Sequence, residues 1–178
     1  MSDNDKHTEG GDKQNIDLYN YNIEEKIQEL GFLLPEPGSP VANYVSTVSF
    51  SETKTSRLVY VSGTGPKKSS GGYITGKLGK DLTIEEGYEA ARITALNVLA
   101  SLKKEVGDLN KIKKFVKVIG MVNCTPDFEK QPAVINGFSD FIVEVFGERG
   151  KHARSAVGMV SLPSKIAVEI EVVVEVLN

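Results

Sequence analysis

The sequence predicts a single α+β domain, in which two helices cover one face of a mixed sheet. Three observations indicate this class. The β-rich segments come in local pairs, only two long amphipathic helices are present, and a length of 178 residues suits one domain with one core. Since two helices can cover only one face of such a sheet, the other face is predicted either to contact water or to be covered by another subunit.

The domain is predicted to span residues 21–178, after a flexible tail at residues 1–20. The start of the chain is rich in Asp, Asn, Lys and Gly and almost free of apolar residues, so burial cannot offset the entropy of ordering it. A short helical extension opens the domain, with an apolar face formed by Ile23, Ile27 and Leu30.

Along the chain, two predicted strands come before the two long helices, one lies between them and two follow them. The first two are separated by a polar stretch, as in a hairpin with a long loop, and the last two are joined by a turn at residues 161–165. The predicted strands cover residues 44–50, 57–63, 112–124, 153–160 and 166–176.

Both long helices have recognisable ends. Thr83 and Glu86 form a capping box, and apolar residues then repeat every three or four positions as far as Gly107. The second helix is predicted to begin near Pro132, a residue suited to the first helical position, and to end at Gly147.

Composition excludes several classes of function. A formal net charge of -3 gives no overall attraction for phosphate backbones, so nucleic acid is an unfavourable partner. Cys124 is the only cysteine, which rules out an internal disulfide and suits a reducing compartment. No apolar run reaches the roughly 18 residues of a membrane helix, and the N-terminus lacks the apolar stretch of a secretory signal. We therefore expect a cytoplasmic protein without a membrane partner.

Two motifs with other possible functions are set aside. Gly71 to Leu78 has the glycine and lysine spacing of a phosphate-binding loop, but Leu78 stands where a Ser or Thr must bind Mg²⁺, and no helix is predicted directly after Lys77. We interpret this stretch as a glycine-rich turn. A metal site is not expected either, because the chain has one cysteine and its two histidines, His7 and His152, do not form a close pair.

The last strand has carboxylates on the face opposite its apolar residues. Alternation places Glu169, Glu171 and Glu175 together, although acidic residues are poor strand formers. Either this face contacts water, or one of the carboxylates has a chemical role.

Arg154 is the candidate partner of such a carboxylate. Alternation in its strand places it on one side with His152 and Ala156. A guanidinium matches a carboxylate in planar geometry, so Arg154 could hold a small acid while Glu169, on a neighbouring strand, orients a water or moves a proton. The alternative is a structural ion pair between Arg154 and Glu169 or Glu171.

Four motifs resemble the signature of the YjgF/Rid family of reactive-intermediate deaminases, also known as endoribonuclease L-PSP proteins. The resemblance spans roughly residues 44–176 and implies a chorismate-mutase-like fold, a homotrimer with active sites between subunits, and no metal or organic cofactor. The motifs are YVSG from Tyr60, ARSAVG from Ala153, LP at Leu162 and Pro163, and VEIEVVV from Val168.

The activity implied by this resemblance is hydrolysis of enamines or imines of 2-oxo acids, such as 2-iminopropanoate and 2-iminobutanoate, to the oxo acid and ammonia. The carboxylate-binding arginine of the family falls on Arg154 and its water-orienting glutamate on Glu169. Other substrate-binding positions fall on Tyr44, Ser62 and Asn136. Each of these has a structural alternative, respectively as a core residue, a turn cap and a solvated helix position.

The chain departs from the family pattern at several positions. Many relatives have a cysteine where this chain has Ala156, so a thiol role is excluded, although the backbone carbonyl there could still help to hold a water. Thr64 stands where glutamine is common. Two other functions stay open: an endoribonuclease, for which only His152 could serve as an acid or base histidine, and a trimeric small-acid-binding or chaperone-like protein in which Arg154 holds a ligand without turnover.

Overall fold

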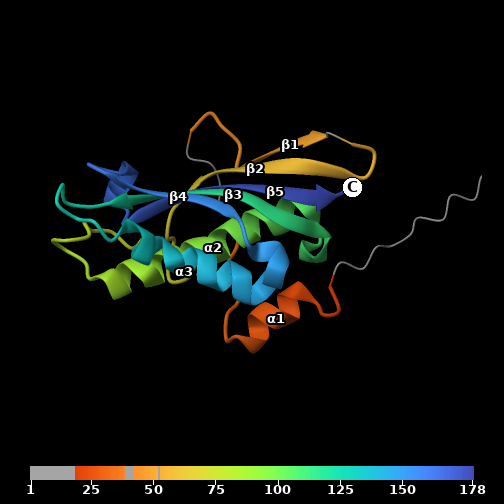
Figure 1. Ribbon diagram of the computed structural model, residues 1–178, viewed down its shortest axis with the longest axis horizontal. Coiled ribbons are helices and arrows are strands. Elements are labelled where there is room, and N and C mark those ends of the chain that lie inside the picture. Colours follow the sequence, from red (N-terminus) through yellow and green to blue (C-terminus); the bar gives the residue numbers. More distant parts are fainter. Residues whose placement is uncertain (1–18, 39–41, 52) are drawn as a thin grey trace, which may run out of the picture.

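A mixed five-stranded sheet forms one layer of the protein, in the order β1-β2-β5-β3-β4 (Figure 1). Every pair of neighbours is antiparallel except β3 and β4, which are parallel. The structure is a computed structural model that describes residues 19–38, 42–51 and 53–178. The strands are β1 (Thr47–Ser51), β2 (Ser56–Thr64), β3 (Ile112–Asn123), β4 (Ala153–Met159) and β5 (Val168–Leu177).

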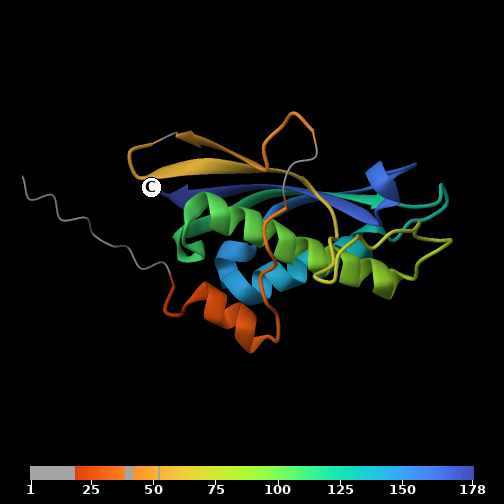
Figure 2. The same ribbon diagram turned by 180° about the vertical axis from the view of Figure 1, so that it is seen from behind.

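The helices lie on one side of this sheet, and the other face carries none of the described helices (Figures 1 and 2). Helices α2 and α3 pack against each other and the sheet, while the short helix α1 packs on the outer side of α3. The helices are α1 (Ile23–Glu29), α2 (Ile84–Val106) and α3 (Gln131–Phe146), with short 3-10 helices at Leu109–Lys111, Gly147–Gly150 and Pro163–Lys165. This arrangement confirms the predicted fold class. No helix in the described part of the chain combines the length and apolar character needed to cross a membrane.

The ends of the long helices follow the sequence signals. Thr83 Oγ1 accepts the Glu86 N–H at 3.1 Å, and Glu86 Oε2 accepts the Thr83 N–H at 2.8 Å, which is the predicted capping box. Helix α2 ends at Gly107 and α3 at Gly147, and both glycines have positive φ. These caps satisfy backbone groups that a helix end leaves unpaired.

The predicted tail lies almost wholly outside the described residues. Of residues 1–20, only Tyr19 and Asn20 are described. The Tyr19 side chain is buried against Phe146, and its hydroxyl donates to the Ile112 carbonyl at 2.6 Å. The chain is therefore anchored to the core just before α1.

The strands β4 and β5 do not lie side by side, although they are consecutive. Strand β3 separates them, because α3 forms a crossover from β3 to a parallel β4 at the edge of the sheet, and β5 then inserts between β2 and β3. Alternation in the sequence indicates which residues of a strand share a face. It does not indicate which strands are neighbours.

Helices α2 and α3 approach closely at Gly137. A Cβ at this position would lie 1.9 Å from the Tyr88 carbonyl oxygen, which is backbone and cannot move aside cheaply. The absence of a side chain at residue 137 therefore sets how close the two helices can lie.

Gly137→Ala should destabilise the fold by about 1 to 3 kcal/mol, since the added methyl forces the two helices apart. Helix propensity alone predicts the opposite sign, because alanine is favoured over glycine inside a helix by roughly 0.5 to 1 kcal/mol. The measurement is the free energy of unfolding from urea denaturation. Gly38→Ala, where the added Cβ would meet nothing within 4 Å, is the control. An unchanged or raised stability for Gly137→Ala would contradict the close approach.

Candidate functional site

Arg154 is held by α3 along one edge of its guanidinium. Its Nη1 donates to Asn136 Oδ1 and to Ser139 Oγ, each at 3.0 Å. Asn136 and Ser139 are three residues apart on α3, so they lie on the same face of the helix. These two bonds use both Nη1 protons and leave the Nε and Nη2 protons without a partner among the described residues.

No carboxylate of the described residues forms an ion pair with Arg154. The structural pair with Glu169 or Glu171 that the sequence also allowed is therefore not found within this chain. The open Nε and Nη2 edge has the geometry for two-point binding of a planar carboxylate.

His152 contacts the same serine that holds Arg154. Its Nε2 lies 3.0 Å from Ser139 Oγ, and its Nδ1 lies 2.6 Å from the Gly150 carbonyl oxygen. A carbonyl can only accept, so Nδ1 carries the proton and Nε2 accepts from the Ser139 hydroxyl. Burial lowers the pKa of His152 and the charge of Arg154 lowers it further, although the bond to Gly150 opposes both. The lowered pKa favours the neutral imidazole at pH 7.

Glu169 lies on the bare face of the sheet and packs against Gly63. A Cβ at residue 63 would be 2.0 Å from Glu169 Oε1, so a side chain there would displace the carboxylate from this position. Burial raises the pKa of Glu169, and the negative charge of Glu171 raises it further. A half-buried carboxyl with a raised pKa is suited to proton transfer near neutral pH.

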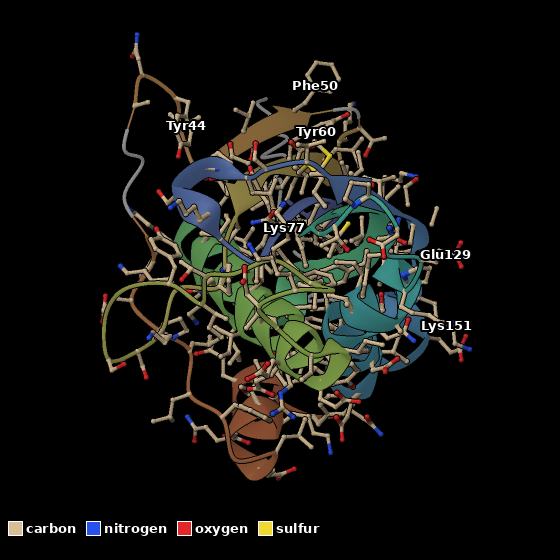
Figure 3. The ribbon with its side chains drawn as sticks, turned by 90° about the vertical axis from the view of Figure 1, so that its left-hand side faces the viewer. Tyr44, Phe50, Tyr60, Lys77, Glu129 and Lys151 are labelled. Carbon is tan, nitrogen blue, oxygen red and sulfur yellow. The ribbon has the colours of Figure 1, made fainter. Side chains whose placement is uncertain are left out.

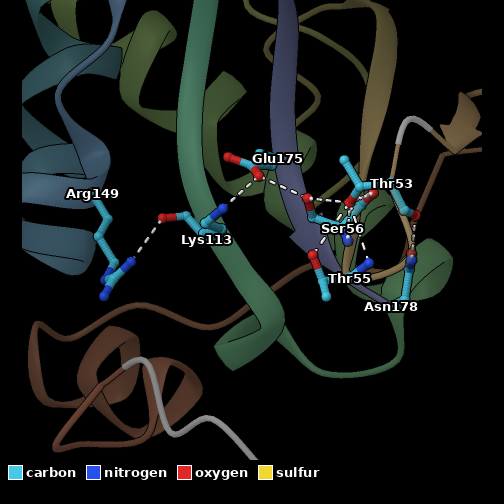
Figure 4. Close-up of polar contacts among 7 residues, drawn as sticks. All are labelled: Thr53, Thr55, Ser56, Lys113, Arg149, Glu175 and Asn178. Carbon is cyan, nitrogen blue, oxygen red and sulfur yellow. Dashed lines mark hydrogen bonds and ion pairs between the residues drawn. The ribbon is translucent and has the colours of Figure 1, made fainter.

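The other two carboxylates of β5 have different environments. Glu175 accepts from Lys113 Nζ at 2.7 Å and from Ser56 Oγ at 2.8 Å, and these bonds lower its pKa (Figure 4). Glu171 is exposed. Of the three glutamates, Glu169 is the one that combines partial burial with no ion pair among the described residues.

Tyr44 and Ser62 line one hollow together with Gly63. Tyr44 is 48% exposed, so the alternative of a core residue is wrong (Figure 3). The Ser62 hydroxyl donates to the Val45 carbonyl at 2.7 Å and ties β2 to the segment before β1. Through Gly63 this hollow adjoins Glu169. We therefore name one part of the candidate site the Glu169 half, which comprises Tyr44, Ser62, Gly63 and Glu169.

The second group of predicted residues gathers at the edge strand β4. Asn136 is exposed and accepts from Arg154, so it is more than a solvated helix position. Ala156, two residues after Arg154 on β4, is half-buried and packs against the core. We name the group at this edge the Arg154 half, which comprises Asn136, Ser139, His152, Arg154 and Ala156.

Within one chain the two halves do not meet. Arg154 is in register with the buried Val118 and so lies on the face covered by the helices, whereas Glu169 is in register with Met121 on the bare face. Their backbones lie two strand spacings apart across the sheet and three residues apart along it, which together place them roughly 14 Å from each other. The prediction that Arg154 and Glu169 lie on neighbouring strands is wrong, because β3 lies between β4 and β5.

Lys77 has a structural role rather than a role in phosphate binding. Its Nζ donates to Asn123 Oδ1, to the Cys124 carbonyl and to the Val160 carbonyl, at 2.7, 3.3 and 2.6 Å. These bonds occupy all three ammonium protons and tie the glycine-rich turn to the ends of β3 and β4. Over residues 19–38, 42–51 and 53–178, no cluster of three His, Cys, Asp or Glu side chains is placed to hold a metal ion.

Three members of the site, Gly63, Ser139 and His152, were not among the residues that the sequence indicated for it. Ser139 could have been found from its spacing of three residues after Asn136 on a predicted helix. The contact between Gly63 and Glu169 had no local signal, because the two residues lie on different strands far apart in the chain.

A family model described as "YjgF/chorismate_mutase-like, putative endoribonuclease" matches residues 24–174. The chain belongs to this family. The predicted relationship is thereby confirmed, and the motifs around Tyr60, Arg154 and Glu169 all lie inside the matched range.

Three proteins with similar sequences or structures match most of the chain. Protein TCP17 from Trypanosoma cruzi is 43% identical over 157 residues, which is 88% of this chain and 95% of that protein. The crystal structure of protein Atu1372 from Agrobacterium tumefaciens is 42% identical with a TM-score of 0.78, covering 86% of this chain and 93% of that one. The crystal structure of "a putative endoribonuclease" from Shewanella oneidensis is 29% identical with a TM-score of 0.82, covering 88% of this chain and 100% of that one.

Glu171→Gln should lower the pKa of Glu169, because it removes the negative charge two residues away. The pKa should stay above its ordinary value, since burial is the larger cause and remains. Carboxyl ¹³C chemical shifts followed through a pH titration measure this change. Glu175→Gln, further along the same face, should leave the Glu169 titration unaltered. An unchanged pKa in Glu171→Gln would contradict the electrostatic coupling of the two carboxylates.

Proposed function

We propose that the protein hydrolyses enamines or imines of 2-oxo acids, of the 2-iminopropanoate and 2-iminobutanoate type, to the oxo acid and ammonia. The observation that carries this proposal is the Arg154 guanidinium, which is fixed along one edge and has its other edge free for a carboxylate. The resemblance of its motifs to those of the reactive-intermediate deaminases supports the same reaction.

Each group has a defined role in the proposed reaction. Arg154 binds the substrate carboxylate at two points and so fixes the adjacent imine carbon. Glu169 orients a water, accepts its proton as the water adds to the C=N bond, and returns that proton to the nitrogen to give a carbinolamine. Glu169 then moves the proton of the new hydroxyl to the nitrogen, so that the C=O bond forms as the C–N bond breaks and ammonia leaves. Tyr44, Ser62 and the Ala156 carbonyl line the pocket. The net change is imine plus water to oxo acid plus ammonia.

The two halves are proposed to meet between copies of the chain, in a homotrimer. Since Arg154 and Glu169 lie on opposite faces of the sheet, one substrate can contact both only if they come from different copies. The bare face also exposes large apolar side chains that a second copy would cover (Figure 3). These are Val48 at 54%, Phe50 at 60% and Tyr60 at 48% exposure.

An endoribonuclease is the second candidate, because the family description and the name of the Shewanella oneidensis relative both contain that activity. The described chain offers His152 as the histidine for such a reaction. Both of its nitrogens are engaged, by Gly150 and Ser139, and burial lowers its pKa. The imine reaction is therefore favoured, and a labelled single-stranded RNA incubated with the protein tests the alternative directly.

Arg154→Ala should weaken binding of 2-oxo acid carboxylates by roughly 2 to 5 kcal/mol and abolish accelerated ammonia release. The substrate is 2-iminopropanoate generated in place by an amino-acid oxidase, with the uncatalysed rate subtracted. Lys151→Ala removes a nearby exposed positive charge and should keep full activity, which makes it the matched control.

No acceleration by the intact protein would refute the proposed reaction. Binding of the oxo acid without turnover would instead support the small-acid-binding function that the sequence left open.

Mixing two inactive variants should restore activity if each site is shared between copies. Arg154→Ala and Glu169→Gln, unfolded together and refolded, form hybrid trimers in which about one quarter of the sites contain both intact residues. The recovered ammonia release should therefore reach about one quarter of the wild-type value. Each variant refolded alone is the control, and the mass in solution reports the trimer. A mixture as inactive as its components would place both residues in sites within one chain, against the proposal.

A further inference from the structure

We propose that Ser139 and His152 form a positioning pair, which holds the Arg154 guanidinium in the orientation that receives a carboxylate. This inference rests on the proposed function and adds two residues to it. Neither belongs to the set that the sequence indicated for substrate binding, and neither needs to touch the substrate.

The hydrogen bonds of this cluster run in a single direction. The His152 Nδ1–H donates to the Gly150 carbonyl, which leaves Nε2 as an acceptor for the Ser139 hydroxyl proton. With that proton directed at His152, the lone pairs of Ser139 Oγ are free to accept from Arg154 Nη1. Without the imidazole the hydroxyl proton would lose this acceptor, and no other contact of Ser139 Oγ among the described residues would fix the direction of its lone pairs.

The imidazole is itself held in place. Its ring packs edge-on against Phe138, with 6.1 Å between ring centroids, and Gly150 belongs to the short 3-10 helix that follows α3. Both neighbours are buried. The position of His152 is therefore set by the core and not by solvent.

Two acceptors on α3 determine which edge of the guanidinium stays open. Asn136 and Ser139 together bind both protons of Nη1, so rotation of the arginine side chain about its carbon–carbon bonds would cost both hydrogen bonds. The Nε and Nη2 edge is thereby directed outward before any ligand arrives. Holding a long, flexible side chain in its bound conformation raises affinity, because less entropy is lost on binding.

A nucleophilic role for Ser139 fits the structure less well. Its oxygen already accepts from Arg154, and it lies inside α3, where backbone N–H groups are bonded within the helix and cannot form an oxyanion hole. A role in positioning accounts for both contacts of its hydroxyl, with Arg154 and with His152.

The test measures binding of 2-oxobutanoate to the full-length protein by calorimetry, together with kcat and KM for imine hydrolysis. Ser139→Ala and His152→Phe should weaken 2-oxobutanoate binding about 5- to 10-fold and raise KM by a similar factor, with kcat nearly unchanged, as expected for loss of one hydrogen bond. Ser139→Thr keeps the hydroxyl and His152→Gln keeps an acceptor near Nε2, so both should restore most of the affinity.

A second measurement does not depend on the variants. The ¹⁵N chemical shifts of His152 in the intact protein should report a neutral ring protonated at Nδ1. A ring protonated at Nε2 would overturn the proposal.

The remaining outcomes separate the two proposals. Wild-type binding by Ser139→Ala and His152→Phe, or a loss in kcat instead of KM, would overturn the positioning pair and leave the proposed function intact. No binding of 2-oxobutanoate by the unmodified protein would overturn both. Equal unfolding temperatures for each variant and its conservative counterpart exclude a general loss of stability.

Discussion

The parallel pairing of β4 with β3 is the constraint on which the candidate site depends. A parallel neighbour requires a crossover, and the crossover here is α3, which therefore lies across the strand that it delivers. This connection brings Asn136 and Ser139 over Arg154 at the edge of the sheet. An arginine in an antiparallel hairpin strand would not have a helix of the same unit above it. The orientation of the guanidinium is thus a consequence of chain topology.

The same topology keeps the two ionisable groups of the site apart. A guanidinium and a carboxylate on adjacent strands would form an ion pair. The arginine would then lose the free donors, and the carboxylate the free acceptors, that a ligand needs. Here β3 lies between them and they project from opposite faces, so Arg154 bonds to neutral acceptors and Glu169 packs beside a glycine. Glu169 is half-buried and has no cation bonded to it, so its pKa is raised. Glu175, on the same face of β5, is bonded to Lys113 and has a lowered pKa. Two carboxylates on one face of one strand therefore have opposite properties.

The one-sided sheet links this arrangement to assembly. Helices α2 and α3 cover one face of the central strands, and the other presents both the Glu169 carboxylate and exposed apolar side chains of β1 and β2. In the proposed trimer, covering that face and completing the pocket are the same event, because the neighbouring copy contributes the group that is missing. Stability of the assembly and formation of the site would then have a common physical origin.

The sequence by itself determined the features that depend on neighbouring residues. Thr83, Glu86 and Gly107 set the ends of α2 through capping, alternation assigned Glu169 and Val168 to opposite faces of β5, and the motif around Arg154 indicated the family. Only the tertiary structure decided which strands are neighbours, that Ser139 joins His152 to Arg154, and that Gly63 leaves room for Glu169. The physical reason is that caps and alternation act over a few residues. These contacts join residues between 13 and about a hundred positions apart in the chain, and the packing of the whole core decides which of them form.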